Sequence, residues 1–67
     1  MNNRSLELCL VRGIYTTKEF SDKVGIELEQ AAALINKDDS VIIKPETIDK
    51  CLKYFNCNYN YFVCLVD

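Results

Sequence analysis

The chain has 67 residues, which is enough for one small domain and too few for a multidomain enzyme with a deep substrate cleft. Apolar residues make up 49% and charged residues 27%, a balance typical of a globular protein and not of a disordered one. Eight basic and ten acidic side chains give a formal charge of −2, which counts against a protein that binds nucleic acid through positive charge alone.

Cysteine usage and the N-terminal residues bear on metal sites and on the cellular compartment. The sequence has no histidine and four cysteines, at Cys9, Cys51, Cys57 and Cys64. Because there is no Cys-x-x-Cys pair and the spacing fits neither a zinc finger nor a zinc ribbon, we expect no metal site and no cofactor. Arg4, Glu7 and Arg12 interrupt the apolar run that a signal peptide needs, and every apolar run is too short to cross a membrane. We therefore expect a cytoplasmic protein with reduced thiols and no membrane contact.

The first helix is predicted from apolar spacing. Over residues 4–12, Leu6, Cys9 and Leu10 recur at i, i+3 and i+4 and form the stripe of an amphipathic helix. We expect this stripe to face the core and Gly13 to end the helix.

The second helix is predicted from a capping box. Thr16 is expected to accept from the amide of Glu19, whose side chain reaches back to the Thr16 amide. Phe20 and Val24 lie one turn apart on one face of the helix that follows, and Gly25 is expected to end it.

Two further helices and an ambiguous tail complete the chain. A third helix is expected over residues 28–36, with an apolar side formed by Ala31, Leu34 and Ile35. Pro45 suits the first turn of a fourth helix. The apolar stripe of that helix is Ile48, Cys51, Leu52 and Phe55. Asn58 could cap a short fifth helix, yet residues 59–66 also have the composition of a strand.

Residues 17–36 resemble the helix-turn-helix of Cro and phage repressors, the xenobiotic-response-element family of bacterial regulators. The similarity lies in the order of a capping Thr16, the small Ser21, Gly25 in the turn and Ile26 in the core, and it extends over nearly the whole chain. It implies one all-α, lambda-repressor-like domain over residues 1–67, with four or five helices and the helix-turn-helix motif at 17–36. It also implies a transcriptional repressor of phage or mobile-element origin that binds double-stranded DNA as a homodimer.

The resemblance also assigns candidate DNA contacts, because in that family the start of the third helix reads base edges and flanking groups contact phosphates. The base-facing candidates are Glu27, Leu28, Glu29, Gln30, Ala32 and Ala33. The phosphate candidates are Thr16, Thr17, Lys18, Asn36, Lys37 and Lys44. Glu can accept from cytosine N4, Ala can contact the thymine methyl, and Gln pairs with purine edges.

Two apolar stretches indicate an association surface, because a domain of this size cannot bury all of them. The candidate dimer or partner interface consists of Val41, Ile42, Ile43, Tyr59, Phe62, Val63, Leu65 and Val66. An alternative interpretation pairs residues 41–43 as a short β-strand with the C-terminal tail, residues 61–66.

An enzyme is not expected, and a second function stays open. The sequence lacks a His base, a Ser nucleophile motif, a glycine-rich phosphate loop and a paired-carboxylate cleft. Glu27 and Glu29, together with Ala32 and Ala33, also suit an acidic surface at the third helix that meets a protein. The alternative is therefore a helix-turn-helix fold that inhibits or modulates a partner protein without binding DNA.

Overall fold

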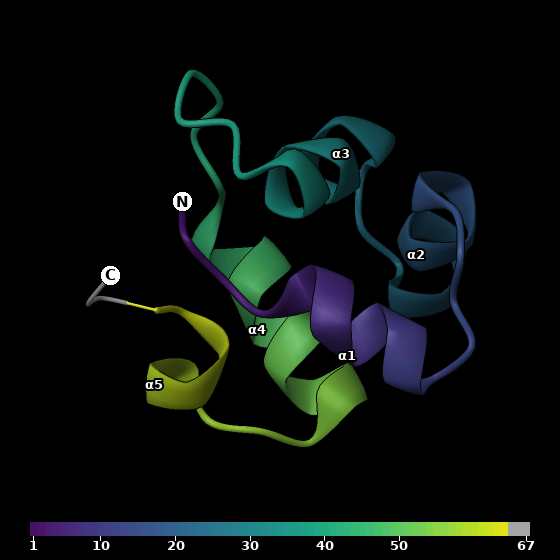
Figure 1. Cartoon of the computed structure of the whole chain (residues 1–67). Helices are drawn as coiled ribbons and strands as arrows, with labels where there is room; N and C mark the ends of the chain where they lie inside the picture. The colour runs from purple at the N-terminus through teal and green to yellow at the C-terminus, as the bar shows by residue number, and fades with distance from the viewer. Residues whose placement is uncertain (65–67) are drawn as a thin grey trace.

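Five α-helices surround one apolar core in the computed structural model, which describes residues 1–64 (Figure 1). They are α1 (Ser5–Val11), α2 (Thr17–Val24), α3 (Leu28–Asn36), α4 (Pro45–Phe55) and α5 (Tyr59–Phe62). The all-α prediction is confirmed, and α3 has the bounds expected from the sequence. Asn58 decides the ambiguous tail in favour of a helix over this part of the chain, since its side chain accepts from the Tyr61 amide and caps α5. Within residues 1–64, no helix has the length and apolar character that crossing a bilayer requires.

The capping box at the start of α2 forms with one change of partner. The Thr16 hydroxyl accepts from the Glu19 amide at 3.1 Å, as predicted. The Glu19 carboxylate accepts from the Tyr15 amide at 3.3 Å, one residue before the expected Thr16 amide. The side chains of Thr16 and Glu19 therefore both accept from backbone amides at the N-terminus of α2 that have no partner within the helix.

Thr16→Ala is expected to lower the free energy of unfolding by about 1 kcal/mol, because the Glu19 amide loses its acceptor. Urea titration followed by far-UV circular dichroism measures the change. Thr17→Ala, one residue later and inside the helix, keeps the cap and serves as the matched control. Equal effects of the two substitutions would contradict the capping role of Thr16.

The connection between α2 and α3 is a three-residue turn, Gly25 to Glu27, that is fixed from several sides. Gly25 has a left-handed backbone, with φ of 81°, and its amide donates to the Ser21 carbonyl at 2.9 Å. The Ser21 hydroxyl donates to the Ile26 carbonyl at 2.6 Å, and Ile26 is buried. From α4, the Lys50 ammonium donates to the Gly25 carbonyl at 3.0 Å. The turn therefore holds α2 and α3 at a fixed angle.

The core is built around three phenylalanines from three helices. The ring centroid of Phe55 lies 6.1 Å from that of Phe20 and 6.4 Å from that of Phe62. Such spacing adds aromatic attraction to the burial of large apolar area. Small and aliphatic side chains from α1, α3 and α4 complete the core, including Cys9, Ala31, Leu34, Ile48 and Cys51.

The prediction for α1 is wrong in which of its side chains are buried. Cys9 is buried as expected, but Leu6 and Leu10 are 42% and 50% exposed. The cause lies before the helix, where the buried Asn3 side chain donates to the Leu34 carbonyl and accepts from the Ser5 amide. This anchor sets the rotation of α1 so that Ser5 and Cys9, one turn apart, face inward.

The two ends of the described chain pair with each other. Asn3 and Val63 form an isolated antiparallel bridge. The Arg4 amide donates to the Phe62 carbonyl, and the Cys64 amide donates to the Asn2 carbonyl, both at 2.9 Å. In residues 1–64 the tail therefore pairs with the N-terminal segment, and the alternative pairing with residues 41–43 is wrong for this part of the chain.

Candidate nucleic-acid interface

The outer side of α3 carries a short stripe of exposed side chains. Leu28 is 53% exposed, Glu29 is exposed, and Ala32, one turn after Leu28, is half-buried. Glu27 precedes the helix and is also exposed. Four of the six base-facing candidates therefore reach the surface, and Asn36 continues the same stripe at the end of the helix.

Gln30 and Ala33 were expected to face DNA, and this prediction is wrong because both are buried. Gln30 is only 2% exposed. Its Nε2 donates to the Ile42 carbonyl at 3.0 Å, and its Oε1 accepts from the Lys44 amide at 2.9 Å and the Thr47 hydroxyl at 3.0 Å. Gln30 therefore fastens α3 to the segment before α4 and to α4 itself, which leaves no polar group of this side chain for a ligand.

An ion pair joins the start of α3 to the start of α4. The Lys44 ammonium donates to the Glu27 carboxylate, and both side chains are exposed. This hydrogen bond and the charge of Lys44 lower the pKa of Glu27 from its usual value, and the same contact raises the pKa of Lys44. Lys44, predicted to contact phosphate, is thus already paired, and Glu27 is the carboxylate that it neutralises.

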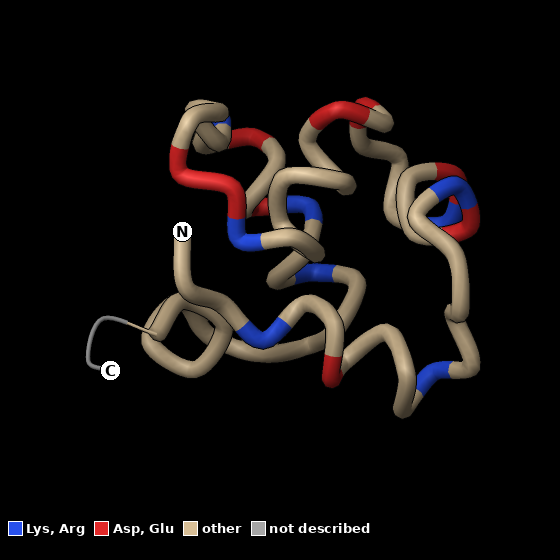
Figure 2. The backbone as a smooth tube through the Cα atoms, turned by 45° about the horizontal axis from the view of Figure 1, so that its top comes forward, with Lys and Arg blue, Asp and Glu red and all other residues tan. Residues whose placement is uncertain are grey.

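The other phosphate candidates are divided between α2 and the end of α3. The Lys18 ammonium lies 3.2 Å from the carboxylate of Asp22, one turn further along α2. The Thr16 hydroxyl already accepts from the Glu19 amide in the cap of α2. Asn36 and Lys37 are exposed where α3 ends. Figure 2 shows both signs of charge along α2 and along the α3–α4 loop, so positive charge does not form one continuous band there.

The predicted association surface is partly exposed and partly core. Ile42 is 87% exposed, Tyr59 is exposed, and Val41 and Ile43 are half-buried. Ile43 and Tyr59 lie at the edge of a surface hollow of about 240 Å³ beside the start of α4.

Other members of the predicted interface are not available to a partner or lie outside the described residues. Phe62 and Val63 were placed in the interface, and this is wrong, because both are buried in the domain's own core. The reason is the pairing of Val63 with Asn3, which draws the end of α5 against the N-terminal segment and α4. Leu65 and Val66 lie outside the described residues.

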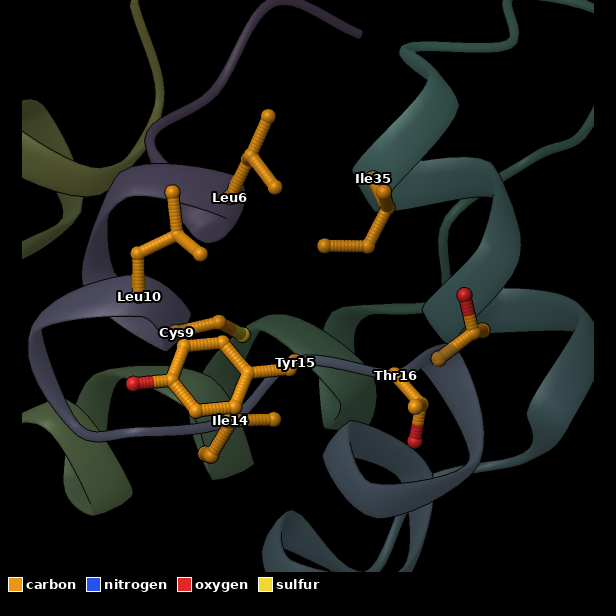
Figure 3. A pocket seen from close by; sticks show the side chains of 8 residues that line it. Leu6, Cys9, Leu10, Ile14, Tyr15, Thr16 and Ile35 are labelled. Carbon is orange, nitrogen blue, oxygen red and sulfur yellow. The ribbon is translucent and has the colours of Figure 1, made fainter.

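A second apolar surface was missed from the sequence. Leu6, Leu10 and Tyr15 line a small hollow of about 70 Å³ between α1 and α3, with Ile35 on its far side (Figure 3). Apolar spacing alone assigns Leu6 and Leu10 to the core, since a seven-residue helix shows too few turns to separate its two faces. Leu6 and Leu10 lie on the surface because the Asn3 contacts with Leu34 and Ser5 set the rotation of α1.

Burial separates the four cysteines into two pairs. Desolvation raises the pKa of the Cys9 thiol to about 11 and that of Cys51 to about 12, with smaller contributions at Cys51 from its neighbours Cys9 and Cys57. Cys57 and Cys64 are half-buried, and burial also raises the pKa of Cys57. Within residues 1–64, no three acidic, Cys or His side chains are placed to hold a metal ion.

At pH 8, iodoacetamide is expected to alkylate Cys57 and Cys64 well before Cys9 and Cys51, because only the thiolate reacts and the two buried thiols stay protonated at that pH. Mass spectrometry of tryptic peptides at several times measures the order. In urea all four should react at similar rates. Rapid alkylation of Cys51 in the native protein would contradict the burial described here.

Searches against the models of known protein families, against curated proteins and against solved structures find no match to this chain. The fold defines a small all-α domain in which two helices joined by a three-residue turn present the start of the second helix to solvent. Function is therefore inferred from that surface and its surroundings.

Proposed function

We propose that the chain is a sequence-specific DNA-binding transcriptional regulator, a repressor of the Cro kind. In this proposal α3 enters the major groove and the N-terminus of α2 lies against the phosphate backbone. The observation that supports it is the unit formed by α2, the turn at Gly25 and α3, in which Gln30 fixes the inner side of α3 and the outer first turn stays exposed.

The ion pair of Glu27 with Lys44 bears directly on this proposal. Two carboxylates at the start of α3 would repel phosphates, but Lys44 neutralises one of them. The exposed Lys37 and Asn36 stand at the other end of the helix as free contacts for the backbone. The electrostatic term is therefore small, and we expect weak non-specific binding and a shallow dependence on salt.

A homodimer would supply a second copy of this surface. Ile43 and Tyr59, which line the hollow beside the start of α4, and the exposed Ile42 form the apolar surface that we propose for pairing two copies. A two-fold arrangement would set the two α3 helices on half-sites about 34 Å apart, one turn of B-DNA.

Fluorescence anisotropy with labelled duplexes at roughly 50 and 200 mM salt tests the proposal. Binding at the higher salt, with a preference for one duplex, is the expected result. Ala32→Glu adds a carboxylate to the outer stripe of α3 and should abolish binding. Asn60→Glu adds the same charge on α5, away from α3, and should not (Figure 1). Circular dichroism of both variants checks that they fold.

A protein partner is the second candidate, and the outer face of α3 favours it. Leu28 is exposed and apolar, and Glu29 beside it is acidic, which suits a protein surface as well as a groove in DNA. In this case α3 and the exposed Ile42 would dock on a regulator that the chain inhibits. Absence of binding to any duplex at roughly 50 mM salt would favour the partner over DNA.

A further inference from the structure

We propose that α3 reads a strand on which thymine and cytosine are neighbours, with Leu28 and Ala32 against thymine methyl groups and the Glu29 carboxylate accepting from cytosine N4. This inference rests on the proposed DNA-binding function and specifies the class of target that its surface fits. It follows from which side chains of α3 are free and from what each can offer to a base.

The three side chains form one contiguous patch. Leu28 and Ala32 lie one turn apart on the same side of α3, and Glu29 lies one turn before Ala32 at i−3. Leu28 is 53% exposed, and Glu29 is exposed with no ion-pair partner within residues 1–64. The patch therefore presents two apolar groups beside a free carboxylate.

The structure removes the side chains that would read purines. The Gln30 amide would suit adenine, but its nitrogen and oxygen are buried and bonded to the Ile42 carbonyl, the Lys44 amide and the Thr47 hydroxyl. The Lys44 ammonium is paired with Glu27. The exposed side chains over the first two turns of α3 consequently contain acceptors and methyl groups and no hydrogen-bond donor.

Each base edge in the major groove can be compared with this patch. Guanine presents two acceptors, N7 and O6, which repel a carboxylate. Adenine presents a donor beside an acceptor, so one carboxylate oxygen would be satisfied and the other opposed. Cytosine presents the N4 donor alone, and thymine presents the C5 methyl that Leu28 and Ala32 can cover. The complementary surface is therefore a thymine–cytosine step.

Selection from a random duplex pool with the full chain, followed by single-atom changes in the recovered site, tests this inference. Recovered sites should share adjacent thymine and cytosine on one strand. Replacing one such thymine by uracil removes only the methyl group and should weaken binding about fourfold, the equivalent of one buried methyl. Replacing the guanine opposite the cytosine by 7-deazaguanine removes an acceptor that the patch does not use and should leave the affinity unchanged.

Variants assign the effects to residues. Leu28→Ala or Ala32→Gly should abolish the difference in affinity between thymine and uracil at the base that the substituted side chain contacts. Glu29→Gln should weaken the preference for cytosine, because an amide both donates and accepts. Glu7→Gln, the same change on α1, is the matched control and should keep the wild-type preferences.

The outcomes separate this inference from the function on which it rests. Failure to recover any site, together with no binding to duplexes, would overturn both. Recovery of a specific site whose affinity ignores the thymine methyl, or falls with 7-deazaguanine, would overturn the assignment to thymine and cytosine while the DNA-binding function stands.

Discussion

Gln30→Ala is expected to lower the free energy of unfolding by about 3 kcal/mol, because loss of the buried side-chain amide leaves several hydrogen-bonding groups without a partner. The substitution removes the Gln30 bonds to the half-buried Lys44 amide and Ile42 carbonyl, and it removes the acceptor of the buried Thr47 hydroxyl. An unsatisfied buried group loses its hydration without compensation, which is more than the net gain from an ordinary hydrogen bond.

Urea unfolding monitored by circular dichroism measures this change, and Glu29→Ala is the neighbouring control. Glu29 is exposed, so its substitution should change the free energy of unfolding by no more than about 0.5 kcal/mol. If Gln30→Ala unfolds at the wild-type urea concentration and also loses DNA binding, Gln30 would contact bases, and its role in holding α3 to α4 would be refuted.

Phe62→Ala is expected to destabilise the domain by about 3–5 kcal/mol, the range for removing a buried aromatic side chain. Phe62 is fully buried, its ring faces that of Phe55, and its carbonyl accepts from the Arg4 amide. A chain of 67 residues has a free energy of unfolding of roughly 3–10 kcal/mol, so the variant should lose a large share of its stability and unfold at a much lower urea concentration than the wild type.

Substitution of the neighbouring Tyr61 should destabilise the domain far less than substitution of Phe62. Tyr61 is half exposed and holds the Arg4 guanidinium over its ring, so Tyr61→Ala should cost about 1 kcal/mol or less. Phe62→Leu keeps most of the apolar volume, and we expect it to fold with a lowered urea midpoint. A folded Phe62→Ala variant that differs from the wild type only in oligomeric state would restore Phe62 to the interface.

The elements that the sequence could predict are those set by neighbouring residues. The bounds of α3 and the start of α4 at Pro45 follow from local spacing and from the fixed φ of proline. The left-handed turn at Gly25 and the cap at Thr16 are also local. Each depends on contacts within about one helical turn, which a single sequence displays directly.

The elements that the sequence could not predict depend on residues far apart in the chain. The rotation of α1 is set by the bond from Asn3 to the Leu34 carbonyl, and no pattern within α1 carries that information. The partners of Gln30 are backbone groups at Ile42 and Lys44, and backbone groups leave no signature in the sequence. The resemblance to the repressor helix-turn-helix placed Leu28 and Glu29 on the surface correctly and failed for Gln30, a polar side chain that is ordinarily expected outside.

The two sides of α3 can change independently of each other. The inner side, with Gln30, Ala31 and Leu34, holds the helix in place, while the outer stripe contributes little to the packing. Substitutions at Leu28, Glu29 and Ala32 would therefore alter what the helix touches and leave folding nearly intact. Such a domain can acquire a new target through a few surface mutations, with each intermediate still folded and exposed to selection.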